Sequence, residues 1–222
     1  MNIYLYLGLV CFAAFAAVVI AWLILRQTRQ DYEYNLDHIL DDLSLENMRD
    51  LEKHLAEFRN ENGLGLNPKF DEVSRILKII DCGDSDDVGN ERAKLTEANK
   101  DGYMFVYHNS GVPQNEKLFD YAHECGHVIN GDQPPRARPE NRHTDRMEER
   151  SADYMAAALL MPLSQVYEEL NDNSYRETTH RKRLKLVKKM SMDYGVTEIN
   201  VLRRIKEVYL LTDAYPALLQ EE

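Results

Sequence analysis

The sequence is poor in cysteine and in excess positive charge. Its three cysteines are an odd number without paired spacing, so they form no disulfide framework, which fits a reducing compartment: Cys11, Cys82 and Cys125. Lys and Arg number 27 against 38 Asp and Glu, and the formal net charge is −11. Because phosphate contacts need a basic surface, we expect no direct binding to nucleic acid. The chain has 222 residues and 44% hydrophobic content, enough for one ordinary domain with appendages.

The N-terminus has the opposite composition, because residues 3–25 contain no charged residue. As a helix this run would be about 34 Å long, enough to cross a hydrocarbon core of about 30 Å. Tyr4 and Tyr6 lie near one end and Trp22 near the other, where interfacial aromatic residues are favoured. The run lacks the basic flank and short apolar segment of a cleaved signal peptide. We therefore predict a transmembrane anchor within residues 1–28, with a buried core helix as the alternative.

Charges beside this run predict its orientation. Arg26 and Arg29 follow the run, whereas no Lys or Arg precedes it. Basic residues favour the cytoplasmic side of a membrane span. We therefore predict a single-pass protein of the cell membrane, with the bulk of the chain in the cytoplasm.

Beyond the anchor the pattern is mainly helical. Residues 31–60 place Leu and Met at helical intervals, and Ser44 is the expected N-cap of a second helix there. A further helix is predicted from about residue 69 to residue 80, and an acidic loop follows it at residues 81–91. The aromatic and β-branched stretch at residues 102–109 predicts a strand.

The stretch FDYAHECGHVIN, residues 119–130, carries the pattern H-E-x-x-H. His123 and His127 are four residues apart, so on a helix both imidazoles can reach one ion. Glu124 lies about 100° round the helix, close enough to reach a water on that ion. Two zinc ligands and a carboxylate base are the chemistry of this motif. The opposite face is apolar and is expected to pack in the core: Leu118, Ala122, Cys125 and Ile129.

A catalytic zinc site needs a third protein ligand, and a second helix offers candidates. In MEERSADYMAAALLMP, residues 147–162, Glu149 and Asp153 share a face with Ala152, Ala156 and Leu160, where the small alanines allow a close approach to the first helix. Two acids on such a face are costly to bury without a cation or donors. A metal on Glu149, with Asp153 accepting from the outer N–H of a ligand histidine, would satisfy both. A solvated acidic edge is the alternative.

These motifs resemble the ImmA/IrrE-type metallopeptidases. HECGHVING is followed, 22 residues after His127, by Glu149 in ERSADYMAAALLMP, and the similarity covers roughly residues 70–211. The resemblance implies an α+β zincin-like core, mostly helical with a small sheet. It also implies one Zn²⁺ per chain on His123, His127 and Glu149, with Glu124 as general base.

The resemblance further implies a protein substrate, in this family often a transcriptional repressor or regulator cleaved at a limited site. The chain departs from the family at Asp153, where asparagine is usual, and at Met155, where an aromatic residue is usual. Both departures leave the ligand set intact. We therefore predict a membrane-anchored zinc endopeptidase. The alternatives are a metal-stabilised regulatory protein that binds without cleaving, which Glu124 disfavours because zinc binding alone needs no base, and a helical adaptor without metal.

Four parts are expected along the chain: an anchor at 1–28, a helical juxtamembrane region at 29–65, the zincin-like core at 66–165 and a C-terminal helical subdomain at 166–222. The basic run at residues 176–190 stands out in an acidic chain. It could meet anionic lipid, an acidic partner or nucleic acid, and a solvated helix face is the simplest interpretation.

The substrate cleft is less determined by the sequence. The strand at residues 102–108 is expected to border the cleft and to hold an extended substrate by edge pairing. An oxyanion stabiliser is also expected, and the sequence does not choose among five candidates: Tyr103, Tyr107, Tyr154, His143 and His180.

Overall fold

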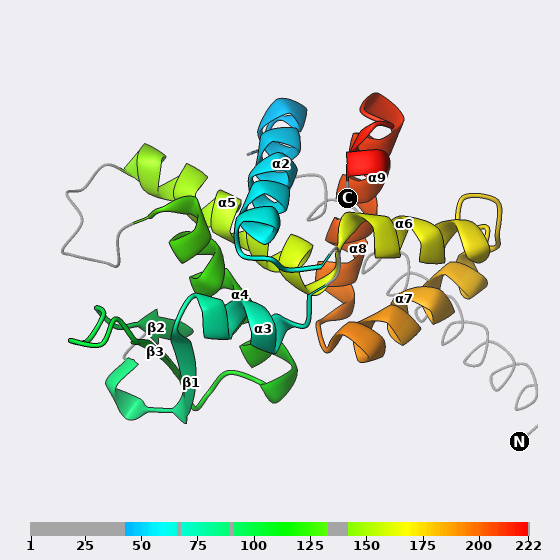
Figure 1. Cartoon of the computed structure of the whole chain (residues 1–222). Helices are drawn as coiled ribbons and strands as arrows, with labels where there is room; N and C mark the ends of the chain where they lie inside the picture. Colours follow the sequence, from blue (N-terminus) through cyan, green and yellow to red (C-terminus); the bar gives the residue numbers. More distant parts are fainter. Residues whose placement is uncertain (1–42, 66–67, 89–90, 133–141, 222) are drawn as a thin grey trace, which may run out of the picture. The chain divides into compact units, whose positions relative to one another are not determined.

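Helices make up most of the structure, and a small three-stranded sheet lies beside them (Figure 1). The computed structural model describes residues 43–65, 68–88, 91–132 and 142–221. The predicted transmembrane run, residues 3–25, lies outside the described residues. Among the residues that are described, no helix is both long and apolar enough to cross a bilayer.

The order of the elements confirms a mostly helical α+β protein, consistent with a zincin-like core. The strands are β1 (Ile79–Asp84), β2 (Ala93–Leu95) and β3 (Met104–His108), and a 3-10 turn, η1, covers Asp86–Val88. The helices are α2 (Leu45–Glu61), α3 (Phe70–Ile76), α4 (Gln114–Asn130), α5 (Arg142–Leu160), α6 (Leu163–Asp172), α7 (His180–Tyr194), α8 (Glu198–Ala214) and α9 (Leu218–Glu221).

The sheet has the order β1-β3-β2, with β1 parallel and β2 antiparallel to the central strand. The strand predicted at residues 102–109 is therefore confirmed as β3, and Val106 in its middle is fully buried. Its central position corrects one expectation. A strand paired on both sides has no free edge, so β3 cannot hold a substrate by edge pairing, and β2 is the edge strand on that side.

The helix predicted over residues 69–80 is too long. Helix α3 ends at Ile76, Lys78 adopts a left-handed conformation with φ 55°, and Ile79 begins a strand. Ile79 and Ile80 pair with Met104 and Phe105. Because β-branched residues pack well in strands, parallel pairing prevails over continued helix here. Strand β1 also includes residues 81–84, the first part of the acidic loop expected at residues 81–91.

Helix α2 packs on α5 and α8 through residues such as Met48 and Leu55, both buried. Ser44 is its N-cap, as predicted, and its side chain accepts a hydrogen bond from the backbone N–H of Asn47 at 3.1 Å. Residues Leu43–Glu222 form one compact unit. The boundaries expected at residues 65 and 165 stay predictions.

Helices α4 and α5 lie against each other (Figure 1). Their packing places the H-E-x-x-H motif of α4 beside the two acids of α5, Glu149 and Asp153. The apolar stripe of α4 is buried as expected at Ala122, Cys125 and Ile129. Gly131 ends α4 in the left-handed conformation, with φ 76°, and its N–H bonds back to the last turn. The motif therefore sits in the last turns of a helix whose other face belongs to the core.

Candidate metal centre

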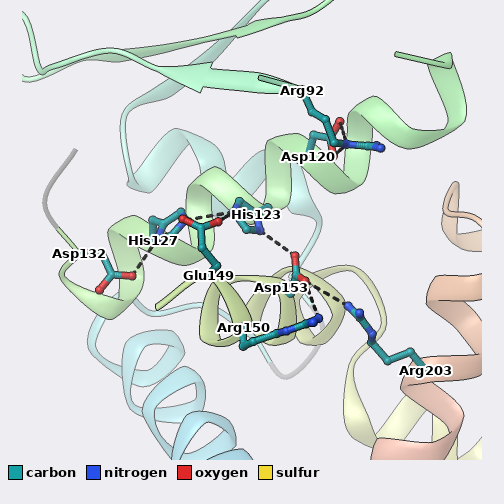
Figure 2. Close-up of polar contacts among 9 residues, drawn as sticks. All are labelled: Arg92, Asp120, His123, His127, Asp132, Glu149, Arg150, Asp153 and Arg203. Atoms are coloured by element: carbon teal, nitrogen blue, oxygen red, sulfur yellow. Dashed lines mark hydrogen bonds and ion pairs between the residues drawn. The ribbon is translucent and has the colours of Figure 1, made fainter. Parts of the chain in front are cut away.

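The two histidines of α4 converge on one point. Their Nε2 atoms are 3.0 Å apart, and the two rings meet edge to face at 82° (Figure 2). The spacing of four residues on a helix produces this arrangement, since it places one ring a turn above the other. His123 and His127 thus turn the same nitrogen toward a shared space.

Glu149 reaches this space from α5. Its Oε2 atom lies 3.2 Å from Nε2 of His123, and its Oε1 atom lies 3.6 Å from Nε2 of His127. One potential ligand atom from each of the three residues lies within 4.8 Å of the others. Two imidazole nitrogens and a carboxylate are the donor set of many catalytic zinc sites. The residues therefore fit a single divalent ion.

The outer nitrogens of both rings are held by carboxylates. Nδ1 of His123 donates to Oδ1 of Asp153 at 2.9 Å, and Nδ1 of His127 donates to Oδ2 of Asp132 at 2.9 Å (Figure 2). A proton held on Nδ1 leaves the lone pair of Nε2 facing inward. This second observation supports the fit, because both rings are fixed in the form that binds a metal.

The electrostatics of the cluster favour positive charge. Burial opposes protonation of His123, but its hydrogen bonds to Asp153 and Glu149 outweigh burial and raise its pKa to about 10. The pKa of His127 is also raised, because contacts with Glu149 and Asp132 outweigh burial. Hydrogen bonds from both histidines hold the pKa of Glu149 well below its usual range. Carboxylates that attract protons to these rings attract a bound cation for the same reason.

Asp153 connects the centre to two arginines. Its Oδ2 atom is 3.3 Å from Nη1 of Arg203 on α8 and 3.8 Å from Nη1 of Arg150 on α5 (Figure 2). Burial alone would raise the pKa of Asp153, but its bond to His123 and the charge of Arg203 lower it. Asp153 therefore stays ionised as the acceptor of the imidazole N–H.

Glu124 lines the same cleft as the two histidines and Glu149. Burial raises the pKa of Glu124 above the ordinary value, against the opposing influence of the two histidines. A raised pKa makes a carboxylate a better proton acceptor near neutral pH. The next residue, Cys125, points the other way, is fully buried and has a raised pKa because of that burial, so it packs in the core as expected.

Gly126 sets the distance between the two helices. A Cβ atom there would lie 2.8 Å from the carbonyl oxygen of Ala152 and 3.0 Å from Cβ of Met155. Since the contact is with backbone, a larger residue would force α4 away from α5. The alanine-lined approach expected from the sequence is therefore present at Ala152, and glycine is required opposite it.

A cleft of about 910 Å³ runs past the centre. Edge strand β2 lines one side, α4 and α5 form the floor, and the first turns of α8 line the other side. The oxyanion candidates whose side chains are described, Tyr103, Tyr107, Tyr154 and His180, do not line it. Tyr154 is buried on the side of α5 that faces α2, and Tyr103 is exposed beside Lys78. The side chain of His143 lies outside the described part.

Several cleft residues were not found from the sequence. Asp132 and Arg203 contact the centre's own residues, and Asn200 lines the wall formed by α8. Arg92 pairs with Asp120 at 3.0 Å near β2 (Figure 2). It also pairs with Glu116 at 2.6 Å. Asp132 had a local signal, an acid just after the glycine that ends the motif helix. The others depend on tertiary contacts that no spacing encodes.

Comparison with known proteins agrees with this geometry. Residues 85–206 match the M78 peptidase family, described as the IrrE N-terminal-like domain. The matched segment is more than half of the chain and contains β2, β3, α4 and α5. A search of curated proteins found no match.

Proposed function

We propose, from the premise that this chain belongs to the M78 peptidase family with its IrrE N-terminal-like domain, that it is a zinc-dependent endopeptidase. The observation that carries the proposal is the convergence of His123, His127 and Glu149, with each outer imidazole nitrogen held by a carboxylate. This donor set would hold one divalent ion, and the cleft that it lines would give a substrate access to it. Zinc is the ion that such donors prefer among those common in peptidases.

The ion, when bound, supplies Lewis acidity, which polarises the scissile carbonyl and lowers the pKa of a water toward about 7. Glu124 accepts the proton of the attacking water and passes it to the leaving amine. The raised pKa of Glu124 suits both steps. Asp153 and Asp132 keep the two imidazoles in one tautomer and one orientation while the charge in the cleft changes.

Strand β2 provides the place for an extended substrate. It is an edge strand of the sheet, and Ala93, Lys94 and Leu95 line the cleft beside the centre. A peptide that adds to this edge gains main-chain hydrogen bonds that do not depend on its sequence. On the other side, at the start of α8, Asn200 and Arg203 line the cleft, and we propose them as oxyanion stabilisers in place of Tyr103, Tyr107, Tyr154 and His180. The candidate His143 stays a prediction.

The natural substrate in this proposal is a protein cleaved at a limited site, such as a transcriptional repressor or regulator. The resemblance to ImmA/IrrE-type peptidases supports this choice. An anchor at residues 3–25 with the catalytic domain in the cytoplasm completes the proposal, supported by the uncharged run and by Arg26 and Arg29. Such an anchor would confine cleavage to partners that come to the membrane.

The first test is metal content. The full chain, purified in mild detergent, should hold about one zinc per chain, and Glu149→Ala should lose most of it, because a three-ligand site loses one ligand. Glu148→Ala, one residue away on the same helix, is the matched control and should keep its zinc. A wild-type chain that folds yet binds no zinc contradicts the proposal.

Catalysis is then separated from binding with Glu124→Gln. This variant should keep its zinc and lose about 10²–10⁴-fold in peptide hydrolysis, the usual contribution of a general base. It therefore also serves to trap and identify the uncleaved partner. If Glu124→Gln and the wild type leave the trapped partner equally intact, the chain binds without cleaving.

A further inference from the structure

Helix α2 lies outside the segment that matches the peptidase family, yet it contacts both helices that carry the centre. The match begins at residue 85, whereas α2 covers Leu45–Glu61. Figure 1 shows α2 beside α5 and close to α8. Two of its polar side chains, Glu52 and His54, make hydrogen bonds to other helices.

Glu52 is a buried acid, 4% exposed, that joins three helices. Its Oε1 atom accepts from the hydroxyl of Tyr154 on α5 at 2.7 Å and from Nη2 of Arg204 on α8 at 2.8 Å. Arg204 is fully buried, donates from Nε to the carbonyl of Met161 at 2.9 Å and lies over the Tyr154 ring. A charge buried this deeply holds its partners in place, because separation would leave it unpaired away from water.

The partners of Glu52 are the immediate neighbours of residues at the metal centre. Tyr154 follows Asp153, which holds His123, and Arg204 follows Arg203, which holds Asp153. Consecutive residues of a helix point about 100° apart, so each helix presents one residue to the centre and the next one to α2. The contact between α5 and α8 is thus held on two sides. Arg203 bonds to Asp153 toward the centre, and Tyr154 and Arg204 bond to Glu52 toward α2.

His54 makes the corresponding contact with α4. Its Nε2 donates to the carbonyl oxygen of Ile129 at 2.9 Å. Ile129 lies between His127 and Asp132, the pair whose hydrogen bond orients the second imidazole. Glu52 and His54 therefore tie α2 to α5 and to α4, the two helices whose spacing sets the distance between Glu149 and the histidines.

We propose, on the basis of the metal site proposed above, that α2 is a positioning element for that site. Glu52 and His54 act through Tyr154, Arg204 and the end of α4, and they hold the three ligand residues at the separation that one ion requires. A displacement of α2 therefore weakens metal binding without touching a ligand.

The experiment compares metal binding between variants of the full chain in detergent. Zinc affinity is measured by competition with a chelator, and the absorption spectrum of the Co²⁺-loaded protein reports the ligand geometry. Tyr154→Phe removes one hydroxyl and keeps the ring, and Glu52→Gln removes only the charge. We expect each to weaken zinc binding about tenfold and to shift the Co²⁺ bands, within the range known for residues that orient ligands.

His54 offers a matched pair of variants. His54→Gln keeps an N–H donor near the Ile129 carbonyl and should retain most of the zinc affinity, whereas His54→Leu removes the donor and should lose it. Leu170→Ala, in the core of α6, serves as the control for stability. It lowers the melting temperature away from the α2 contacts and should leave zinc affinity and the Co²⁺ spectrum unchanged.

The zinc affinities and Co²⁺ spectra of these variants test the positioning role of α2. Unchanged affinity and spectrum in Tyr154→Phe and Glu52→Gln would overturn the positioning role, as would an equal loss in Leu170→Ala at the same drop in melting temperature. In either case the wild type still binds zinc and the proposed function stands. A wild type that binds neither zinc nor cobalt would overturn the proposed function and, with it, the role of α2.

Discussion

Two different ionic clusters contact α5, one on the side of the cleft and one on the side of α2. Toward the cleft, Glu149 and Asp153 face two imidazoles. Burial lowers the pKa of His123, but hydrogen bonds to these two carboxylates outweigh it and raise the pKa to about 10. Toward α2, Glu52 and Glu207 face Arg204, which brings its own permanent charge. There burial raises the pKa of Glu207 to about 7.

The difference separates a binding site from a structural cluster. The front cluster, His123, His127, Glu149 and Asp153, turns potential ligand atoms of three residues to one point, as the proposed metal site requires. The rear cluster, Glu52, Arg204 and Glu207, contains the guanidinium of Arg204 as its cation. Both contain strongly shifted pKa values, so a shift by itself does not indicate function. What distinguishes them is geometry: the first turns three potential ligand atoms to one point, whereas the second surrounds the guanidinium of Arg204.

The largest expected effect falls on the rear cluster. Arg204→Met leaves Glu52 and Glu207 buried without a cation, and we expect a loss of about 3–5 kcal/mol in the free energy of unfolding, measured with urea. Lys189→Met removes an exposed pair with Glu169 and should cost no more than about 1 kcal/mol. Equal losses in the two variants would mean that the rear cluster is not a cation-dependent core.

A smaller effect is expected for the carboxylates that orient the imidazoles. Asp132→Ala and Asp153→Ala should each weaken zinc binding about 10–100-fold, because the ring that loses its acceptor is free to turn or to change tautomer. Asp153→Asn keeps an acceptor for the Nδ1 proton and should lose much less. Zinc competition measures all three. An Asp153→Asn loss as large as that of Asp153→Ala would show that charge, and not orientation, is what Asp153 supplies.

The effect that is smallest at neutral pH is a dependence of stability on pH from Glu207, because most of it is lost by about pH 7. Its pKa is raised from 4.5 to about 7 by burial, so between these values the folded protein binds a proton that the unfolded chain releases. Its contribution is therefore fully present below about pH 4.5 and is lost as the pH rises through about 7, at roughly 1 kcal/mol per pH unit. The unfolding free energy should be measured for the wild type and for Glu207→Gln between pH 5 and 7. The variant should lack the slope that the wild type shows. The same substitution at Glu169 should leave it in place.

The front cluster was more predictable than the rear one. Helical spacing alone brings His123 and His127 together, and a run ending in Leu-Leu-Met-Pro identifies the helix of Glu149. Asp132 lies only five positions from His127 and was within reach of a local pattern. The pairs Arg203–Asp153 and Arg204–Glu52 join residues 50 and 152 positions apart, which no local pattern encodes. The spacing also identified the face of α4 that packs in the core.

Predictions failed where two local signals conflicted. The apolar residues that suggested a helix through residue 80 also suit a buried strand, and only the neighbouring β3 decides between them. The strand expected to bind substrate was correctly placed in the sequence and wrongly placed in the sheet. Composition predicts a strand, but its position at the centre or the edge depends on which strands pair with it.

The contact at Gly126 bears on how far apart the two ligand-bearing helices lie. Because the α4 side of this contact has no side chain and the α5 side is backbone, no rotamer change at residues 126 and 152 can make room for a larger residue there. The two main chains therefore set the shortest distance between α4 and α5, and only the side chains of the three candidate ligands can adjust within it. A larger residue at position 126 would separate the helices, so that His123, His127 and Glu149 would have to span a wider space around the ion.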